Sequence, residues 1–96
     1  TLPIADVRCF IAEQKYVTAV APGRELLIQD ALKDLEQEFA AEFLRVHRNA
    51  LVARRHIQRL RRDTEGGWSV ELDGVDLRPQ VSRRHLAAVK ARLQQG

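Results

Sequence analysis

The chain has 96 residues, 45% of them hydrophobic, and a formal net charge of +3. That length and apolar content suit one domain built on its own core, and they exclude a chain that is disordered throughout. No apolar run reaches the roughly 18–20 residues needed to cross a bilayer, and the lone Cys9 cannot form an internal disulfide. A membrane span, a retained signal peptide and a disulfide-stapled secreted scaffold are therefore excluded.

The first thirty residues predict three short strands. Residues 7–20 are rich in β-branched and aromatic side chains, which strands prefer, and the polar run at 13–15 is placed to turn one strand into the next. Pro22-Gly23 is a strong turn signal, and a short apolar run follows it at 26–28.

The pattern then changes to the period of a helix. Leu32, Leu35 and Phe39 lie at positions i, i+3 and i+7, on one helical stripe, and Asp30 is the expected N-cap. The exposed positions of this helix are mostly acidic, so we expect it to face away from any nucleic acid; they are Asp34, Glu36 and Glu38.

Residues 44–52 alternate with the period of a strand. Arg48 falls among the apolar positions of that alternation, so we expect a turn or a bulge near Arg48-Asn49. Residues 54–62 fit either a helix or one arm of a hairpin, and this choice stays open.

The last third predicts a strand at 68–72, a turn at Asp73-Gly74 and a return to the sheet at Val75 and Leu77. A final helix follows, with Ser82 as its N-cap and an apolar stripe formed by Leu86, Val89 and Leu93. Residues 1–96 thus predict one mainly β, multi-stranded domain of six to eight strands, with one central and one C-terminal short helix. Because the chain begins at Thr1 and contains no methionine, we expect it to be the C-terminal fragment of a longer protein.

The cations concentrate in two segments that lack acidic residues. Residues 45–62 hold seven arginines and residues 78–96 hold five more cations, so these two segments account for twelve of the sixteen. Such polarity predicts one basic face, as in proteins that bind a polyanion, although ordinary solvated charges in an arginine-rich composition are the alternative. The excess of arginine over lysine favours forked contacts with phosphates and guanine edges.

Two places in these segments could bind an anion. Ser82 as N-cap puts Arg83 and Arg84 in the first helical turn, where cations oppose the helix dipole. An anion would remove the conflict, because backbone N–H groups and both guanidinium groups would converge on one phosphate or base edge. The alternative is a pair of solvated arginines that happen to follow a cap.

The second place is the expected turn at Arg48 and Asn49, since Arg and Asn are the side chains that read guanine and adenine bidentately. Any basic strand offers the same residues, so this signal is weak alone. Lys15 could add a phosphate contact at the first turn, and Tyr16 fits a stacking ring or a core position equally well.

The sequence does not favour catalysis. Cys9 lies in an apolar strand and suits a small core residue, and the three histidines are too scattered for a zinc pattern. Ser82 and His85 lack a third partner, and no glycine-rich phosphate loop occurs. We therefore expect no enzyme activity, no metal and no cofactor.

Four segments follow one another in a recognisable order: LPIADVRCFIAEQKYVTAV, ALKDLEQEF, FLRVHRNALV and VSRRHLAAVKARL. They resemble LytTR-type DNA-binding domains over nearly the whole chain, and RVHRxxLV and VSRRxL at this separation are the specific parts. The resemblance implies a compact, mostly β fold whose loops enter the major groove of DNA. It also implies dimers on paired sites, and an N-terminal receiver domain served by a sensor kinase.

The family's DNA contacts come from three loops, which map onto the Lys15-Tyr16 turn, onto Arg48 and Asn49, and onto Arg83-Arg84. The family commonly has Gly-Asn where this chain has Gln14-Lys15, and Ser-Tyr where it has Asn49-Ala50. These departures leave the fold expectation unchanged and leave open which base sequence is recognised.

Together these observations predict a sequence-specific, double-stranded DNA-binding domain of a cytoplasmic bacterial response regulator that controls transcription. Arg84 and Arg48 are expected to reach base edges, while Arg83, Asn49 and Lys15 position or assist. Two other classes stay open, an RNA-binding β domain and a basic module that binds an acidic protein. The small number of aromatic residues, 5% of the chain, argues against stacking of single strands.

Overall fold

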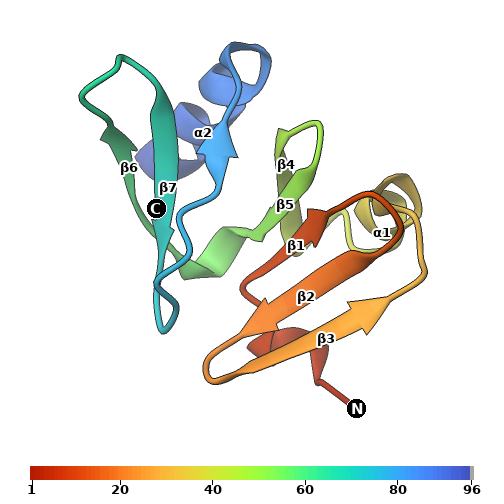
Figure 1. The fold of residues 1–96 in the computed structure, drawn as a ribbon. Helices are drawn as coiled ribbons and strands as arrows, with labels where there is room; N and C mark the ends of the chain where they lie inside the picture. Colours follow the sequence, from red (N-terminus) through yellow and green to blue (C-terminus); the bar gives the residue numbers. More distant parts are fainter. Residues whose placement is uncertain (96) are drawn as a thin grey trace.

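The computed structural model describes residues 1–95, whose eight short strands form two antiparallel sheets (Figure 1). The five strands of the first sheet lie in the order β3-β2-β1-β5-β4, and the three of the second in the order β6-β7-β8. Their bounds are β1 Cys9–Ala12, β2 Val17–Ala21, β3 Arg24–Ile28, β4 Phe43–His47, β5 Ala50–Ala53, β6 Ile57–Arg62, β7 Trp68–Leu72 and β8 Gln80–Val81.

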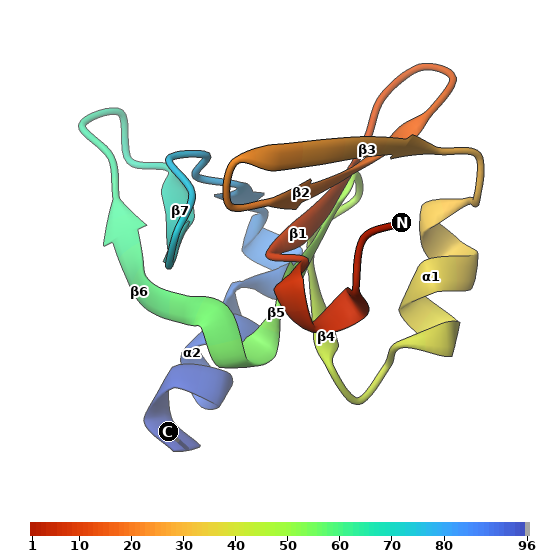
Figure 2. The same ribbon diagram turned by 90° about the horizontal axis from the view of Figure 1, so that it is seen from below.

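Two α-helices complete the described fold: α1 at Leu32–Glu38 and α2 at Arg83–Gln95. The chain also has two 3₁₀ turns. The first, η1 at Ile4–Asp6, precedes β1, and the second, η2 at Arg54–His56, joins β5 of the first sheet to β6 of the second. Seen from below, α1 covers the face of the first sheet that points away from β6 and β7 (Figure 2). The mainly β architecture with a central and a C-terminal helix is as predicted.

The first sheet has a core on each face because its strands alternate. One core lies against α1 and includes Phe10, Leu51 and Leu35, which are at most 4% exposed. The other lies against the second sheet and α2, and it joins Val52 of β5 to Val70 of β7 and Val89 of α2, none of which has any exposed surface. Every residue of β2 and β5 is consequently buried.

The segment at 54–62, which the sequence left undecided, turns first and then extends. Its first three residues form η2, and Ile57–Arg62 then runs as β6 beside β7. Contacts with Asp73 hold the connection between the two sheets in place. His56 Nδ1 lies 2.7 Å from Asp73 Oδ1, and Arg8 Nε donates to the carbonyl of Asp73 at 2.9 Å. Burial acts to raise the pKa of Asp73, but the hydrogen bond and charge of His56, together with Arg8, outweigh it and lower the pKa.

Two local expectations were wrong. Asp30 does not cap α1: the N-cap is Ala31, which has no side-chain hydrogen bond, and the helix is anchored by the buried Leu32. Val75 and Leu77 do not resume the sheet, and β8 begins only at Gln80. Pro79 lacks an N–H and cannot donate a hydrogen bond to a neighbouring strand, which disfavours an extension of β8 toward Leu77.

Candidate nucleic-acid interface

The three segments singled out in the sequence meet at one edge of the molecule. The Ala12 N–H donates to the carbonyl of Asn49 at 2.8 Å, which joins the end of β1 to the β4–β5 turn. The Ser82 N–H donates to the carbonyl of Val46 at 2.9 Å, which joins the beginning of α2 to the end of β4. In Figure 1 the β4–β5 turn accordingly lies between the β1–β2 turn and the start of α2.

All five residues predicted for the site are exposed at this edge: Lys15, Arg48, Asn49, Arg83 and Arg84. We call these five residues the basic edge. They come from three separate segments, so only the folded chain brings them together.

The β1–β2 turn presents Lys15 on a short hairpin. Residues 13 and 16 close the turn through the Glu13 N–H, which donates to the Tyr16 carbonyl at 2.8 Å. Tyr16 is 45% exposed, so its ring is available for contact and the core alternative is wrong.

The β4–β5 turn consists of Arg48 and Asn49, as the interrupted alternation predicted. A shift in the strand register occurs just before it, between Arg45 and His47. The Asn49 N–H points back at His47 Nδ1, 3.4 Å away. The side chains of Arg48 and Asn49 therefore project from the tip of two strands that are buried in the sheet.

The beginning of α2 places Arg83 and Arg84 in the first helical turn, as predicted from Ser82. The Ser82 hydroxyl lies 2.7 Å from Nδ1 of His85, one turn further along. Burial lowers the pKa of His85, and the nearby cations Arg84 and Arg45 lower it further. The Nδ1 of a neutral imidazole can accept a hydrogen bond from the hydroxyl, so this pair orders the start of the helix without adding charge.

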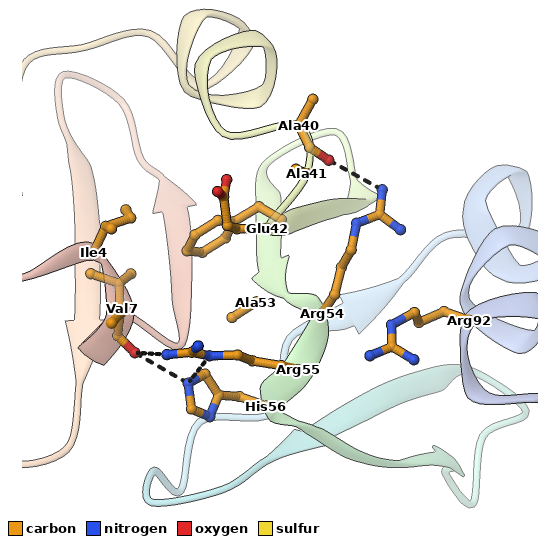
Figure 3. A pocket seen from close by; sticks show the side chains of 12 residues that line it. Ile4, Val7, Ala40, Ala41, Glu42, Ala53, Arg54, Arg55, His56 and Arg92 are labelled. Carbon is orange, nitrogen blue, oxygen red and sulfur yellow. Dashed lines mark hydrogen bonds between the residues drawn. The ribbon is translucent and has the colours of Figure 1, made fainter. Parts of the chain in front are cut away.

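Most other cations of the acid-free segments lie away from this edge, although Arg62 lines the same hollow as Arg83, so the expectation of one continuous basic face was wrong. Figure 3 shows Arg54, Arg55 and Arg92 around a cleft of about 720 Å³ where β4 begins and β5 ends. Because β4 and β5 are antiparallel, this cleft lies at the opposite end of the strands from the Arg48-Asn49 turn. The η2 turn, which directly follows β5, places Arg54 and Arg55 at this cleft.

A second group of cations surrounds Glu71 on β7. Arg59, Arg61 and Arg78 lie 3.2, 2.7 and 4.0 Å from its carboxylate oxygens. The hydrogen bond from Arg61, opposed by burial and helped by the charges of Arg59, Arg61 and Arg78, lowers the pKa of Glu71. Arg59 and Arg61 lie on β6 of the second sheet and Arg78 lies in the loop before β8, and Glu71 partly neutralises all three.

The sequence also missed the role of Arg45, the first arginine of the acid-free segment. Its guanidinium does not point outward: Nη1 pairs with Glu36 of α1 at 2.5 Å, and the other two nitrogens donate to main-chain carbonyls. Glu36, expected on the solvent face of its helix, is only half exposed for this reason. No local pattern reveals a pair that forms between a helix and the strand after it.

Cys9 has no exposed surface, and burial, with a smaller contribution from the charge of Glu25, raises its pKa to about 12. Within residues 1–95, no group of three or more histidine, cysteine, aspartate or glutamate side chains is placed to hold a metal ion. Within the same residues, no helix is long and apolar enough to cross a membrane.

An exposed edge of arginine, lysine and asparagine on a small β scaffold is the arrangement of a nucleic-acid-binding domain. The comparison with protein families makes the class specific. Residues 1–94 match the family described as the LytTr DNA-binding domain, and the chain belongs to that family.

The chain is similar to known regulatory proteins, among them the following two. The positive alginate biosynthesis regulatory protein of Pseudomonas aeruginosa is 45% identical over 95 residues, which cover 98% of this chain. The chain spans 38% of the length of that relative. A solved LytTr DNA-binding domain of a methyl-accepting/DNA response regulator from Bacillus cereus superposes with a TM-score of 0.81 at 22% identity. That match covers 96% of this chain and 84% of the other, and it shows the same fold.

Proposed function

We propose that the chain binds double-stranded DNA in a sequence-specific manner through the basic edge. The observation that carries this proposal is the convergence of five exposed polar or cationic side chains from three segments, held together by main-chain hydrogen bonds. Membership of a DNA-binding family supports it. Arg48 and Arg84 would read base edges, and Lys15, Asn49 and Arg83 would contact phosphates or assist.

The electrostatic design suits turns that enter a groove. The positive end of the helix dipole at the start of α2 and the adjacent guanidinium groups favour a phosphate at the same place. The β4–β5 turn lies between that helix start and the Lys15 hairpin. Phosphate contacts on both sides would fix its register over the bases.

The names of the related proteins support a proposal about the wider role. They describe a regulator of alginate biosynthesis and a response regulator. We therefore propose that this domain is the effector part of a longer cytoplasmic two-component response regulator. It would act as a transcriptional activator of alginate or virulence-type genes, bind promoter DNA as a dimer on paired sites, and be controlled by an N-terminal receiver domain and its sensor kinase.

A competition titration tests the binding mode. A labelled duplex promoter fragment is bound first, and then challenged with unlabelled duplex, single-stranded DNA, duplex RNA and heparin at matched phosphate concentration. We expect the cognate duplex to compete best, since base-edge readout needs the major groove. Equal competition by single-stranded DNA or by RNA would contradict duplex DNA binding and favour the RNA-binding alternative. Equal competition by heparin would indicate a surface that binds polyanions or acidic proteins in general.

A protection footprint on genomic promoter fragments identifies the site itself. Two protected patches separated by about one helical turn, roughly 10–10.5 base pairs centre to centre, or by a multiple of it would support dimers on paired sites. A single isolated patch at saturation would contradict that part of the proposal.

A further inference from the structure

We propose that Arg45 is a positioning residue that clamps the β4–β5 turn from inside the molecule and, through Glu36, ties the turn to helix α1. This inference deepens the proposed DNA-binding function and rests on it for its effect on recognition. The clamp itself is a property of the free protein and can be tested without DNA.

All three nitrogens of the guanidinium are engaged. Nε donates to the carbonyl of His47 at 2.8 Å, and Nη2 donates to the carbonyl of Arg48 at 2.7 Å. Nη1 donates to Glu36 Oε1 at 2.5 Å. The side chain of Arg45 is 21% exposed, and its bonds to His47 and Glu36 are partly shielded from water, whereas the bond to the Arg48 carbonyl is exposed. The ion pair is consequently stronger than one between two fully exposed side chains.

The two carbonyls that Arg45 binds bracket the start of the turn. His47 ends β4, and Arg48 is the first of the two turn residues. Without a donor, both oxygens would turn toward water or toward the phosphates that the edge is proposed to approach. The guanidinium satisfies them and fixes the turn backbone before any ligand arrives, which lowers the entropy cost of ordering it on binding.

The register shift in β4 makes this reach possible. The strand is irregular between Arg45 and His47, which bends the ladder at the point where the side chain folds forward over the turn. A lysine in the same place would keep the charge but offer one compact ammonium group in place of a planar fork. Shape, as well as charge, is therefore required at position 45.

Helix α1 gains a role in this arrangement. Glu36 holds the far side of the guanidinium, so the helix braces the turn even though its other acidic residues, Asp34 and Glu38, are exposed. Arg45 is thereby withdrawn from the set of cations that can contact phosphate. In this proposal the turn residues Arg48 and Asn49 contact DNA, and Arg45 acts only by holding their backbone in place.

The test uses the 96-residue chain with Arg45→Lys and Glu36→Gln, and a matched pair of controls on the second sheet, Arg61→Lys and Glu71→Gln. The control residues form an arginine–glutamate pair of 2.7 Å that lies away from the turn. Amide hydrogen exchange and ¹⁵N NMR spectra are recorded without DNA, with particular attention to the Nε–H of Arg45 and the amides of residues 48–50. Thermal melts of each variant confirm that it is folded.

We expect about tenfold faster exchange of the turn amides in Arg45→Lys, since two charge-assisted hydrogen bonds to the backbone are lost. Glu36→Gln, which keeps both carbonyl bonds, should give a smaller increase, and the controls none. A slowly exchanging Arg45 Nε–H signal is expected in the wild type. Wild-type exchange in both test variants, or an increase equal to that in the controls, would overturn the clamp.

The DNA arm separates the clamp from the proposed function. For Arg45→Lys we expect the ratio of cognate to scrambled affinity to fall about tenfold, while the salt dependence stays unchanged because the charge is kept. A lower salt dependence in Arg45→Gln would show that Arg45 contacts phosphate and would refute the positioning role. If the wild type itself does not discriminate between duplexes, the function proposal fails, and the exchange data still decide the clamp. If Arg45→Lys does not melt cooperatively, Glu36→Gln decides it.

Discussion

The salt dependence of DNA binding measures how many cations the basic edge uses. The structure leaves four exposed cations there: Lys15, Arg48, Arg83 and Arg84. At about 0.9 counterions released for each phosphate neutralised, a plot of log affinity against log salt should have a slope of about −1.8 if only Lys15 and Arg83 contact phosphates, and of about −3.6 if Arg48 and Arg84 do so as well. Contacts by all twelve cations of the acid-free segments would instead give about −11.

Two variants with the same change of charge locate those contacts. Arg83→Ala should weaken cognate and scrambled duplexes alike and make the slope shallower by about 0.9, since one phosphate contact is lost. Arg61→Ala should leave the slope unchanged, because Arg61 lies beside Glu71 on the second sheet. Fluorescence anisotropy from 50 to 300 mM salt supplies both slopes. A wild-type slope steeper than about −6, or equal effects of the two variants, would refute the division of cations described above.

Three further results follow from the geometry. Arg84→Ala should cost about 1–3 kcal/mol on the cognate site and flatten discrimination at one or two base pairs; an equal loss on scrambled DNA in the same anisotropy assay would make Arg84 a phosphate clamp only. His85 has a pKa below 6.5 in the folded chain, so the unfolded chain binds more protons and stability falls as pH drops through 6.5 toward the folded pKa. Urea unfolding between pH 5 and 8 should show this loss in the wild type and not in His85→Gln, and identical profiles would contradict it. Gly74→Ala should destabilise by about 1–3 kcal/mol more than Gly66→Ala, because both residues have positive φ but only at Gly74 would the new Cβ meet Pro22 Cγ, at 2.8 Å. Chemical melts of the two variants measure the difference, and equal losses would remove the clash as its cause.

The parts of the fold that follow from short-range patterns could be predicted from the sequence. The alternation interrupted at Arg48 predicted a turn or a bulge near Arg48-Asn49, where the structure has the β4–β5 turn, and Ser82 predicted the start of α2 at Arg83. Both depend on the few residues around them. The same holds for Cys9, whose apolar neighbours indicated a buried strand position.

The parts that depend on long-range geometry could not be predicted. Each acid-free segment is continuous in sequence, but the folded chain distributes the cations among the basic edge, the cleft where β5 ends and the second sheet. Nothing near Arg45 indicates that its partner is on the preceding helix. Val75 and Leu77 alternate like a strand, yet tertiary contacts at Asp73 and the proline at 79 decide that they form a loop.

The burial of β5 on both faces has an evolutionary consequence. Ala50 and Val52 belong to one core, and Leu51 and Ala53 to the other. An insertion of one residue within the strand would exchange the two sets, so the strand tolerates almost no change in length. The adjoining turn residues, Arg48 and Asn49, are exposed and do not belong to either core. Descendants of this domain can therefore acquire new target sequences by altering a few turn side chains while the scaffold beneath them stays the same.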